Sequence, residues 1–248
     1  YIWLATTHPA LLYTQMKNAY DRGIRDLWIL NVGDIKPAEY LIELYLDMAW
    51  NINAIEDNKN GLQKHLGDWL AREFGDTNAK LLLPVMNEYY RLAYIRKPEF
   101  MGNTRVEETD SLYKKVKDLP WSRETVEGRI CDYTKIENTV IGLSKTISED
   151  KYPSWFQLIE YPVRAAAEMN KKMMYGQLAR HGFNDWSQSD AAYDTIVALT
   201  KRYNSLHQGK WNRMMDGDPR RLSDFAKLPH ISISTPMEEN KLPSILFN

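Results

Sequence analysis

One short segment, Asn31-Val32-Gly33-Asp34-Ile35-Lys36-Pro37, holds the side chains best suited to chemistry in this 248-residue chain. A positioned aspartate can transfer a proton, and an asparagine amide can bond to sugar hydroxyls. The intervening glycine permits a positive φ or the close approach of a ligand. We therefore take Asp34 as the candidate catalytic residue and Asn31 as a candidate binding residue. The alternative is that Asp34 caps a helix starting at Ile35.

Four further residues are candidates for ligand binding, and each has a structural alternative. Arg96 could form a bidentate contact with a carboxylate, or it could simply be a cation favoured at a helix C-terminus. Asn170 lies in an otherwise apolar helix face, where it either reaches a cleft or bonds to a buried neighbour. Lys210 and Trp211 could form a donor beside an aromatic platform for a sugar, or the indole could pack under its own loop.

The segment 31–37 must be positioned by the elements around it. Leu27-Trp28-Ile29-Leu30 is a continuous apolar run, which predicts a strand buried on both faces. An earlier strand is expected at 2–5, with a helix between them that starts after His8-Pro9 and stops at Gly23. This is a βαβ pattern. In a barrel of parallel strands, the residues that follow a strand lie on the face where active sites are built.

After Pro37 the apolar residues recur at helical spacing. The prediction is a mainly α chain: a terminal βαβ remnant of a (β/α)8 barrel at 1–36, a helical bundle domain at 37–228, and an irregular tail at 229–248. Ser122 is expected to cap one helix. Pro153 should open another that runs to about Arg180 with a bend near Pro162. A long loop is expected at 101–120, and a short strand at 231–234.

Composition excludes several classes of protein. Lys and Arg number 32 against 33 Asp and Glu, so the basic excess of a nucleic-acid binder is missing. No apolar run is long enough to span a membrane. The single Cys131 excludes an internal disulfide, and the five histidines show no metal-ligand spacing. We expect no metal site, and the sequence contains no Gly-rich phosphate loop, HExxH or GxSxG motif.

Several segments together resemble glycoside hydrolase family 115. The run from Asp26 to Pro37, followed by Leu46-Asp47-Met48-Ala49-Trp50-Asn51, looks like the family's signature at the end of its catalytic barrel. Similar stretches continue through the helical part, so that the resemblance covers most of residues 1–215. They are Tyr94-Ile95-Arg96-Lys97-Pro98-Glu99, Phe156-Gln157-Leu158-Ile159-Glu160-Tyr161-Pro162-Val163, Ala167-Glu168-Met169-Asn170-Lys171-Lys172 and Gly209-Lys210-Trp211-Asn212-Arg213-Met214-Met215.

The resemblance implies an α-glucuronidase that removes glucuronic acid, or its 4-O-methyl ether, from xylan. It implies inverting hydrolysis of an α-1,2 bond without a cofactor, on glucuronoxylan or aldouronic acid oligosaccharides, in a periplasmic or secreted protein. Inversion needs two separated carboxyl groups. Because the chain opens at Tyr1 with most of a barrel missing, we expect an internal fragment that is inactive alone. The alternative is a non-catalytic helical module for interaction or homodimerisation.

Overall fold

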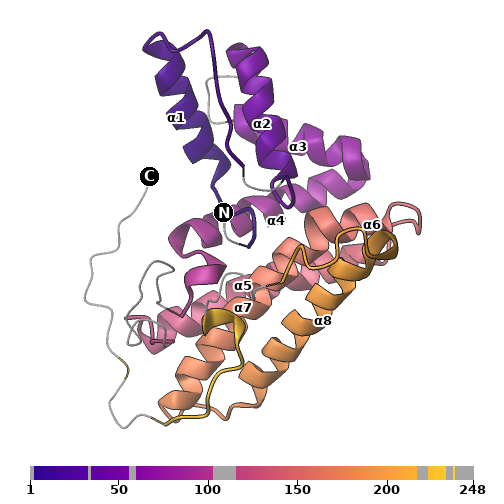
Figure 1. Ribbon diagram of the computed structural model, residues 1–248. Coiled ribbons are helices and arrows are strands. Elements are labelled where there is room, and N and C mark those ends of the chain that lie inside the picture. Colours follow the sequence, from indigo (N-terminus) through magenta and orange to yellow (C-terminus); the bar gives the residue numbers. More distant parts are fainter. Residues whose placement is uncertain are drawn as a thin grey trace.

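The computed structural model is an all-helical arrangement in the part of the chain that it describes, residues 3–32, 35–55, 60–102, 116–216, 223–232 and 237 (Figure 1). Its longer helices are α1 (Pro9–Asp21), α2 (Glu39–Trp50), α3 (Gly61–Phe74), α4 (Asp76–Ile95), α5 (Arg123–Ser144), α7 (Tyr161–Arg180) and α8 (Ser187–Gly209). The short helical pieces are η1 (Ile52–Ala54), η2 (Pro98–Phe100), α6 (Tyr152–Trp155), η3 (Phe156–Glu160) and η5 (Ser223–Phe225).

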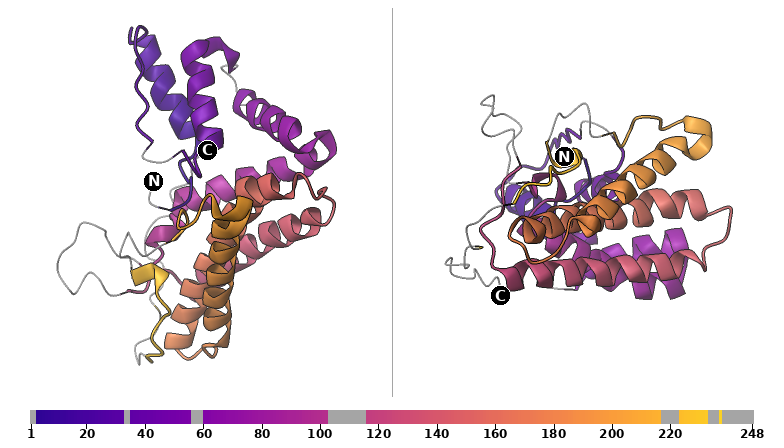
Figure 2. Two further views of the ribbon diagram at one scale, coloured as in Figure 1. Left: turned by 45° about the vertical axis from the view of Figure 1, so that its right-hand side comes forward. Right: turned by 90° about the horizontal axis from the view of Figure 1, so that it is seen from below.

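Helix α7 forms the centre of the main bundle. It packs against α5 on one side and α8 on the other, while α4 contacts α5 and α3 contacts α4 (Figures 1 and 2). Nearly every residue of α7 is buried, including small ones such as Ala165, Ala166 and Ala167. Small side chains on a central helix let its neighbours approach closely, so the apolar core is continuous across the bundle.

The ends of several helices confirm the local signals in the sequence. The Ser122 hydroxyl accepts a hydrogen bond from the Thr125 N–H and caps α5, as predicted. Gly75 separates α3 from α4 with φ +83°, and Gly23 follows α1 with φ +93°, both in the region where a Cβ is costly.

The helix predicted to start at Pro153 is continuous with α7 but is not uniform. α6 leads into η3, a π-helical turn at 156–160, and α7 follows directly. Pro162 has no N–H to donate to the carbonyl four residues earlier. The departure from α-helical geometry therefore lies in the turn just before this proline, close to where the bend was expected.

Helices α1 and α2 form a hairpin with its own small core of Leu44, Met48, Ile52 and Ile55. The hairpin extends away from the main bundle (Figures 1 and 2). α1 contributes only partly buried residues to this core, so the core buries much less apolar surface than the bundle does.

The expected βαβ remnant of a (β/α)8 barrel is wrong, because the described residues contain no strand. Leu27 and Ile29 are 72% and 80% exposed, so the segment expected to be buried on both faces is on the surface. The Trp28 indole N–H donates to the Ile24 carbonyl instead. A strand needs a neighbour to pair its backbone groups, and an apolar run alone cannot show whether one exists.

The segment expected as the first strand is fixed by side chains rather than by a sheet. The Trp3 indole N–H donates to the Tyr161 hydroxyl at 3.1 Å, and the Tyr89 hydroxyl donates to the Ala5 carbonyl at 3.2 Å. Leu4 is fully buried. Residues 3–8 therefore form an irregular segment held against α4 and α7.

The segment at 223–228 is anchored on the same bundle. The fully buried Lys172 ammonium donates to the carbonyls of Asp224 and Ala226, and the Asp224 carboxylate accepts from the Gly102 N–H at 2.7 Å. Burial lowers the pKa of Lys172 to about 8. Of the strand expected at 231–234, residues 231 and 232 are not in a strand, and the others lie outside the described residues.

Candidate functional site

The turn after the regular part of α8 is the most strained backbone in the described chain. His207, Gln208 and Arg213 have φ values of 50°, 60° and 66°, and Gly209 has φ +82°. Only glycine adopts this region without cost, and each other residue there costs roughly 1–3 kcal/mol. Strain of this kind persists only where surrounding contacts enforce it, and such residues cluster at functional sites.

Contacts from Asn204 and Asp216 hold this turn closed. The Asn204 amide donates to the Asp216 carboxylate at 2.6 Å and accepts from the Met215 N–H at 3.3 Å. Arg213 also donates to Asp216, at 3.1 Å. The chain therefore leaves α8, reverses direction within a few residues and presents Lys210 and Trp211 from a fixed loop.

The turn meets the segment that the sequence analysis selected. The Lys36 and Lys210 ammonium nitrogens each lie 4.9 Å from the centre of the Trp211 indole. Lys36 is also paired with Glu39, in the first turn of α2, at 2.6 Å. We call Lys36, Lys210 and Trp211 the basic aromatic corner. Residues 174 positions apart in the sequence thus form one surface.

The corner has the chemistry of a site for an acidic sugar. Two ammonium groups attract a carboxylate, and an indole packs against the apolar face of a pyranose. The Trp211 ring is partly buried against the bundle core, so its orientation is fixed. Next to Lys36, residues Pro37 and Glu39 border a cavity of about 20 Å³, which admits about one water. The corner is therefore an open surface and not an enclosed cavity.

Asn31, one of the predicted binding residues, is exposed and precedes Lys36 by five positions. Gly33 and the predicted catalytic Asp34 lie outside the described residues. The alternative in which a helix starts at Ile35 is wrong, because α2 begins at Glu39 after Ala38. The role of Asp34 remains a prediction.

Arg96 and Asn170 do not lie at the corner: Asn170 is buried in the bundle core, Arg96 is partly exposed at the end of α4, and both contact Arg129. The Arg129 guanidinium donates to the Asn170 amide oxygen at 2.7 Å and to the Leu92 and Arg96 carbonyls at 3.0 and 2.9 Å. Asn170 is fully buried, and its amide nitrogen donates to the Ala166 carbonyl at 2.8 Å.

The Arg96 side chain donates to the Phe100 carbonyl at 2.8 Å. The contacts of Asn170 agree with the alternative of a buried neighbour, and the roles of Arg96 and Asn170 in ligand binding stay predictions. Of the six predicted residues, Asn31 and Lys210 are exposed, Arg96 and Trp211 are partly buried, Asn170 is fully buried, and Asp34 lies outside the described residues.

Two important residues were missed by the sequence analysis. Lys36 belongs to the segment 31–37, but a lysine beside a proline gave no sign that a distant tryptophan would contact it. Arg129 was missed although it falls in the apolar helical stripe of Val126, Ile130 and Tyr133, where a buried charge requires partners. An arginine in an apolar helical stripe could therefore have been identified from the sequence as a buried charge with bonding partners.

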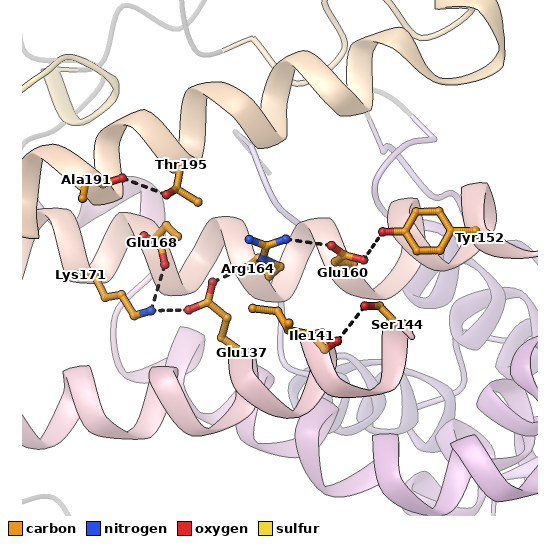
Figure 3. Close-up of polar contacts among 10 residues, drawn as sticks. All are labelled: Glu137, Ile141, Ser144, Tyr152, Glu160, Arg164, Glu168, Lys171, Ala191 and Thr195. Atoms are coloured by element: carbon orange, nitrogen blue, oxygen red, sulfur yellow. Dashed lines mark hydrogen bonds and ion pairs between the residues drawn. The ribbon is translucent and has the colours of Figure 1, made fainter. Parts of the chain in front are cut away.

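A second polar cluster lies between α5 and α7 (Figure 3). Lys171 bridges the carboxylates of Glu137 and Glu168, and Arg164 bridges Glu137 and Glu160. Three carboxylates thus meet two cations in a largely buried place. Burial, followed by repulsion from Glu137, raises the pKa of Glu168 to about 7. Protonation of Glu168 would balance the charge of the cluster.

Helices with the length and apolarity needed to cross a membrane are not found among the described residues. Groups of three or more His, Cys, Asp or Glu arranged to hold a metal ion are likewise not found in that part of the chain.

Comparison with known proteins gives the family. The profile described as glycosyl hydrolase family 115 matches residues 1–100. A solved structure of a family GH115 4-O-methyl-α-glucuronidase, BtGH115A, described as having specificity for decorated arabinogalactans, is similar over all of this chain, with 50% sequence identity and a TM-score of 0.93. The present chain spans 32% of that protein's length. The search of curated proteins found no match. The chain belongs to glycosyl hydrolase family 115.

Proposed function

We propose that the whole protein, of which this chain is a part, removes glucuronic acid or its 4-O-methyl ether from a polysaccharide. Membership of family 115 and the similarity to a 4-O-methyl-α-glucuronidase support a glycoside hydrolase. The observation that carries the proposal is the basic aromatic corner, where two lysines and an indole from distant segments form a surface suited to a uronic acid.

In this proposal the corner binds the sugar that is released. Lys36 and Lys210 neutralise the uronate carboxylate, and Trp211 supports the apolar face of the ring. Lys210 is exposed, with no carboxylate partner among the described residues, so its charge is available to a ligand. Glu39 holds Lys36 near the indole, which fixes its ammonium group before the substrate arrives.

The proposed reaction is inverting hydrolysis of an α-1,2 bond. One carboxylic acid protonates the leaving oxygen, and a second carboxylate activates a water on the opposite face, with the two about 6.5–9.5 Å apart. Asp34, three residues after Asn31, is the proposed contributor from this chain. The other carboxyl group would come from elsewhere in the protein, so we expect the isolated 248-residue chain to release no glucuronic acid.

The polysaccharide that carries the uronic acid is the open part of the proposal. Glucuronoxylan is proposed from the family resemblance, and the similar solved protein is described as specific for decorated arabinogalactans. Release of glucuronic acid from each polymer by the whole protein, at equal uronic acid content, distinguishes them. A much higher kcat/KM on the arabinogalactan would overturn the choice of xylan but not the proposed reaction.

The test of the corner is a set of substitutions in the whole protein. We expect Lys36→Met and Lys210→Met each to lower kcat/KM on an aldouronic acid by about 10-fold or more, mainly through KM, because a charge-assisted contact is lost. Trp211→Ala should act in the same direction. Lys201→Met is the matched control, since Lys201 is an exposed lysine on α8 outside the corner. Unchanged kinetics in all three variants would remove the corner from the site.

Asp34→Asn separates catalysis from binding. It keeps the size of the side chain, so we expect the fold to persist and kcat to fall by about 10²-fold or more, the scale of a lost acid or base. Kinetics near those of the unsubstituted enzyme would remove Asp34 from the proposed mechanism.

A second candidate function is a helical module for interaction or homodimerisation. The observation that favours it is the exposed apolar surface of the α1–α2 hairpin, where Trp50 is 92% exposed and Leu46 is 54% exposed. Light scattering of the whole protein tests it. A dimer that Trp50→Lys converts to a monomer would support this role, and a monomer at all concentrations would exclude homodimerisation.

We also propose a periplasmic or secreted location, which fractionation of the producing cells would check.

A further inference from the structure

A surface pocket of about 310 Å³ lies at the opposite end of α8 from the basic aromatic corner. Its lining comes from α5, from the end of α7 and from the turn into α8, which meet at the lower end of the bundle in Figure 1. α8 rises about 1.5 Å per residue, so Gln188 in its first turn is on the order of 25 Å from the turn that carries Trp211. The pocket is a separate site.

The walls of this pocket combine apolar and aromatic surface. Ile130 and Leu178 form largely buried lining, at 7% and 4% exposure. Tyr175 and Phe183 supply two aromatic rings, and Phe183 is 45% exposed. The Arg123 guanidinium lies 4.6 Å from the centre of the Phe183 ring and limits how that ring can turn. The pocket therefore contains an aromatic ring, that of Phe183, whose orientation is restricted by Arg123.

The polar groups of the pocket are two amides and one carboxylate. Asn184 donates to the Gln188 amide oxygen at a long 3.3 Å, and the Asn184 amide oxygen is buried without a partner among the described residues. A buried acceptor without a partner costs free energy, which a donor from a ligand would recover after a small turn of this side chain. Glu127 is the one charged residue in the lining, and it accepts from Arg123 at 2.7 Å.

We propose that this pocket binds a neutral sugar unit of the polysaccharide backbone. A pyranose has an apolar C–H face that packs on Phe183 or Tyr175 and hydroxyl groups that pair with Asn184, Gln188 and Glu127. The volume is at the lower end of the range for small-molecule sites, roughly 300–1,000 Å³. Arg123, the cation beside the pocket, is already paired with Glu127, so the pocket suits a neutral sugar better than the uronic acid, which the corner suits instead.

The two sites would together hold one polymer at two points. Binding at the pocket raises the effective concentration of the same chain at the corner, without a new contact there. The inference rests on the proposed function only in its choice of a polysaccharide as the ligand.

The single Cys131 makes a direct test possible. Its side chain is exposed and lines the pocket, and the chain contains no other cysteine, so a Cys131→Ser variant of the whole protein identifies the signal of this thiol. A sugar in the pocket should therefore slow the reaction of Cys131 with a thiol reagent such as Ellman's reagent. The probes are xylotriose and galactobiose, which lack a uronic acid and separate a xylan from an arabinogalactan source. At a probe concentration of about ten times Kd the rate should fall about tenfold, because only the unoccupied fraction reacts.

Substitutions locate the effect within the pocket. Phe183→Ala and Asn184→Leu should abolish the protection, which is measured for each variant as the ratio of rates with and without the probe. Tyr94→Ala is the matched control, because Tyr94 is a 49% exposed aromatic residue outside the pocket, and it should keep the protection. Circular dichroism of each variant verifies that it is folded.

Three results would overturn the proposal. They are no protection by either probe, equal protection in Phe183→Ala and Asn184→Leu, and equal protection by sorbitol at the same mass concentration. Lys210→Met should leave the protection unchanged. Failure of the whole protein to release glucuronic acid, with Cys131 still protected, would contradict the proposed function but not the pocket.

Discussion

The α1–α2 hairpin and the main bundle both contain apolar runs but bury them very differently. In the bundle, α7 buries even Asn170 and Lys172 completely. In the hairpin, Leu27, Ile29 and Trp50 are mostly exposed. A helix satisfies its own backbone groups and needs only a neighbour for its apolar face, whereas a strand also needs a partner for its backbone. The apolar pattern therefore predicts helices more safely than isolated strands.

The largest effect should come from the buried charge that joins the helices of the bundle. Arg129→Met removes the donor to Asn170 and to two carbonyls at the end of α4, so the fully buried Asn170 amide oxygen loses its charged partner. We expect the free energy of unfolding in urea to fall by about 3–5 kcal/mol. Arg123→Met, an exposed arginine on the same helix, should change it by less than about 0.5 kcal/mol. Equal losses would mean that Arg129 has no special structural role.

The second effect tests the small core of the hairpin. Leu44 is fully buried there, so Leu44→Ala should cost about 2–5 kcal/mol of local stability through lost burial and a cavity. Hydrogen exchange of the α1 and α2 amides measures this directly. If those amides exchange at the same rate as in the unsubstituted chain, the hairpin core contributes little to local stability. The difference in core packing between the hairpin and the bundle would then be larger than the structure indicates.

A smaller effect depends on pH and involves the cluster between α5 and α7. The folded-state pKa of Glu168, about 7, lies above its ordinary value of 4.5. Its protonation therefore stabilises the fold fully below pH 4.5, and this contribution is lost as the pH rises through about 7. Glu168→Gln imitates the protonated form and keeps this contribution at pH 8. At that pH its free energy of unfolding should exceed that of the unsubstituted chain by on the order of 1–3 kcal/mol.

The control for this prediction is Glu124→Gln, which changes an exposed glutamate of α5. The difference in free energy of unfolding between this variant and the unsubstituted chain, measured by urea titration, should not change between pH 5 and 8. If the difference in free energy of unfolding is also independent of pH for Glu168→Gln, Lys171 keeps Glu168 ionised throughout this range.

The smallest effect is expected where the strand was predicted. Leu27→Lys and Ile29→Lys replace exposed side chains, so the free energy of unfolding of the chain should change by less than about 0.5 kcal/mol each. A loss as large as that of Leu44→Ala would contradict the exposed position of this segment.

The sequence alone determined the helical class of residues after 37, most helix ends and the family. These features depend on neighbours in the chain: Ser122 caps its own helix, and Gly75 ends one through its own φ. The resemblance also rests on contiguous motifs. Such local signals need no knowledge of what lies nearby in space.

Only the tertiary structure decided which candidate residues meet. Lys36 and Trp211 are far apart in the sequence, and no spacing rule could place them against each other. Asn170 and Arg96 were candidates for ligand binding, and only the structure showed that Arg129 bonds to the Asn170 amide and to the Arg96 carbonyl. The strand at 27–30 failed for the same reason, because burial and backbone pairing depend on distant partners that a local pattern does not contain.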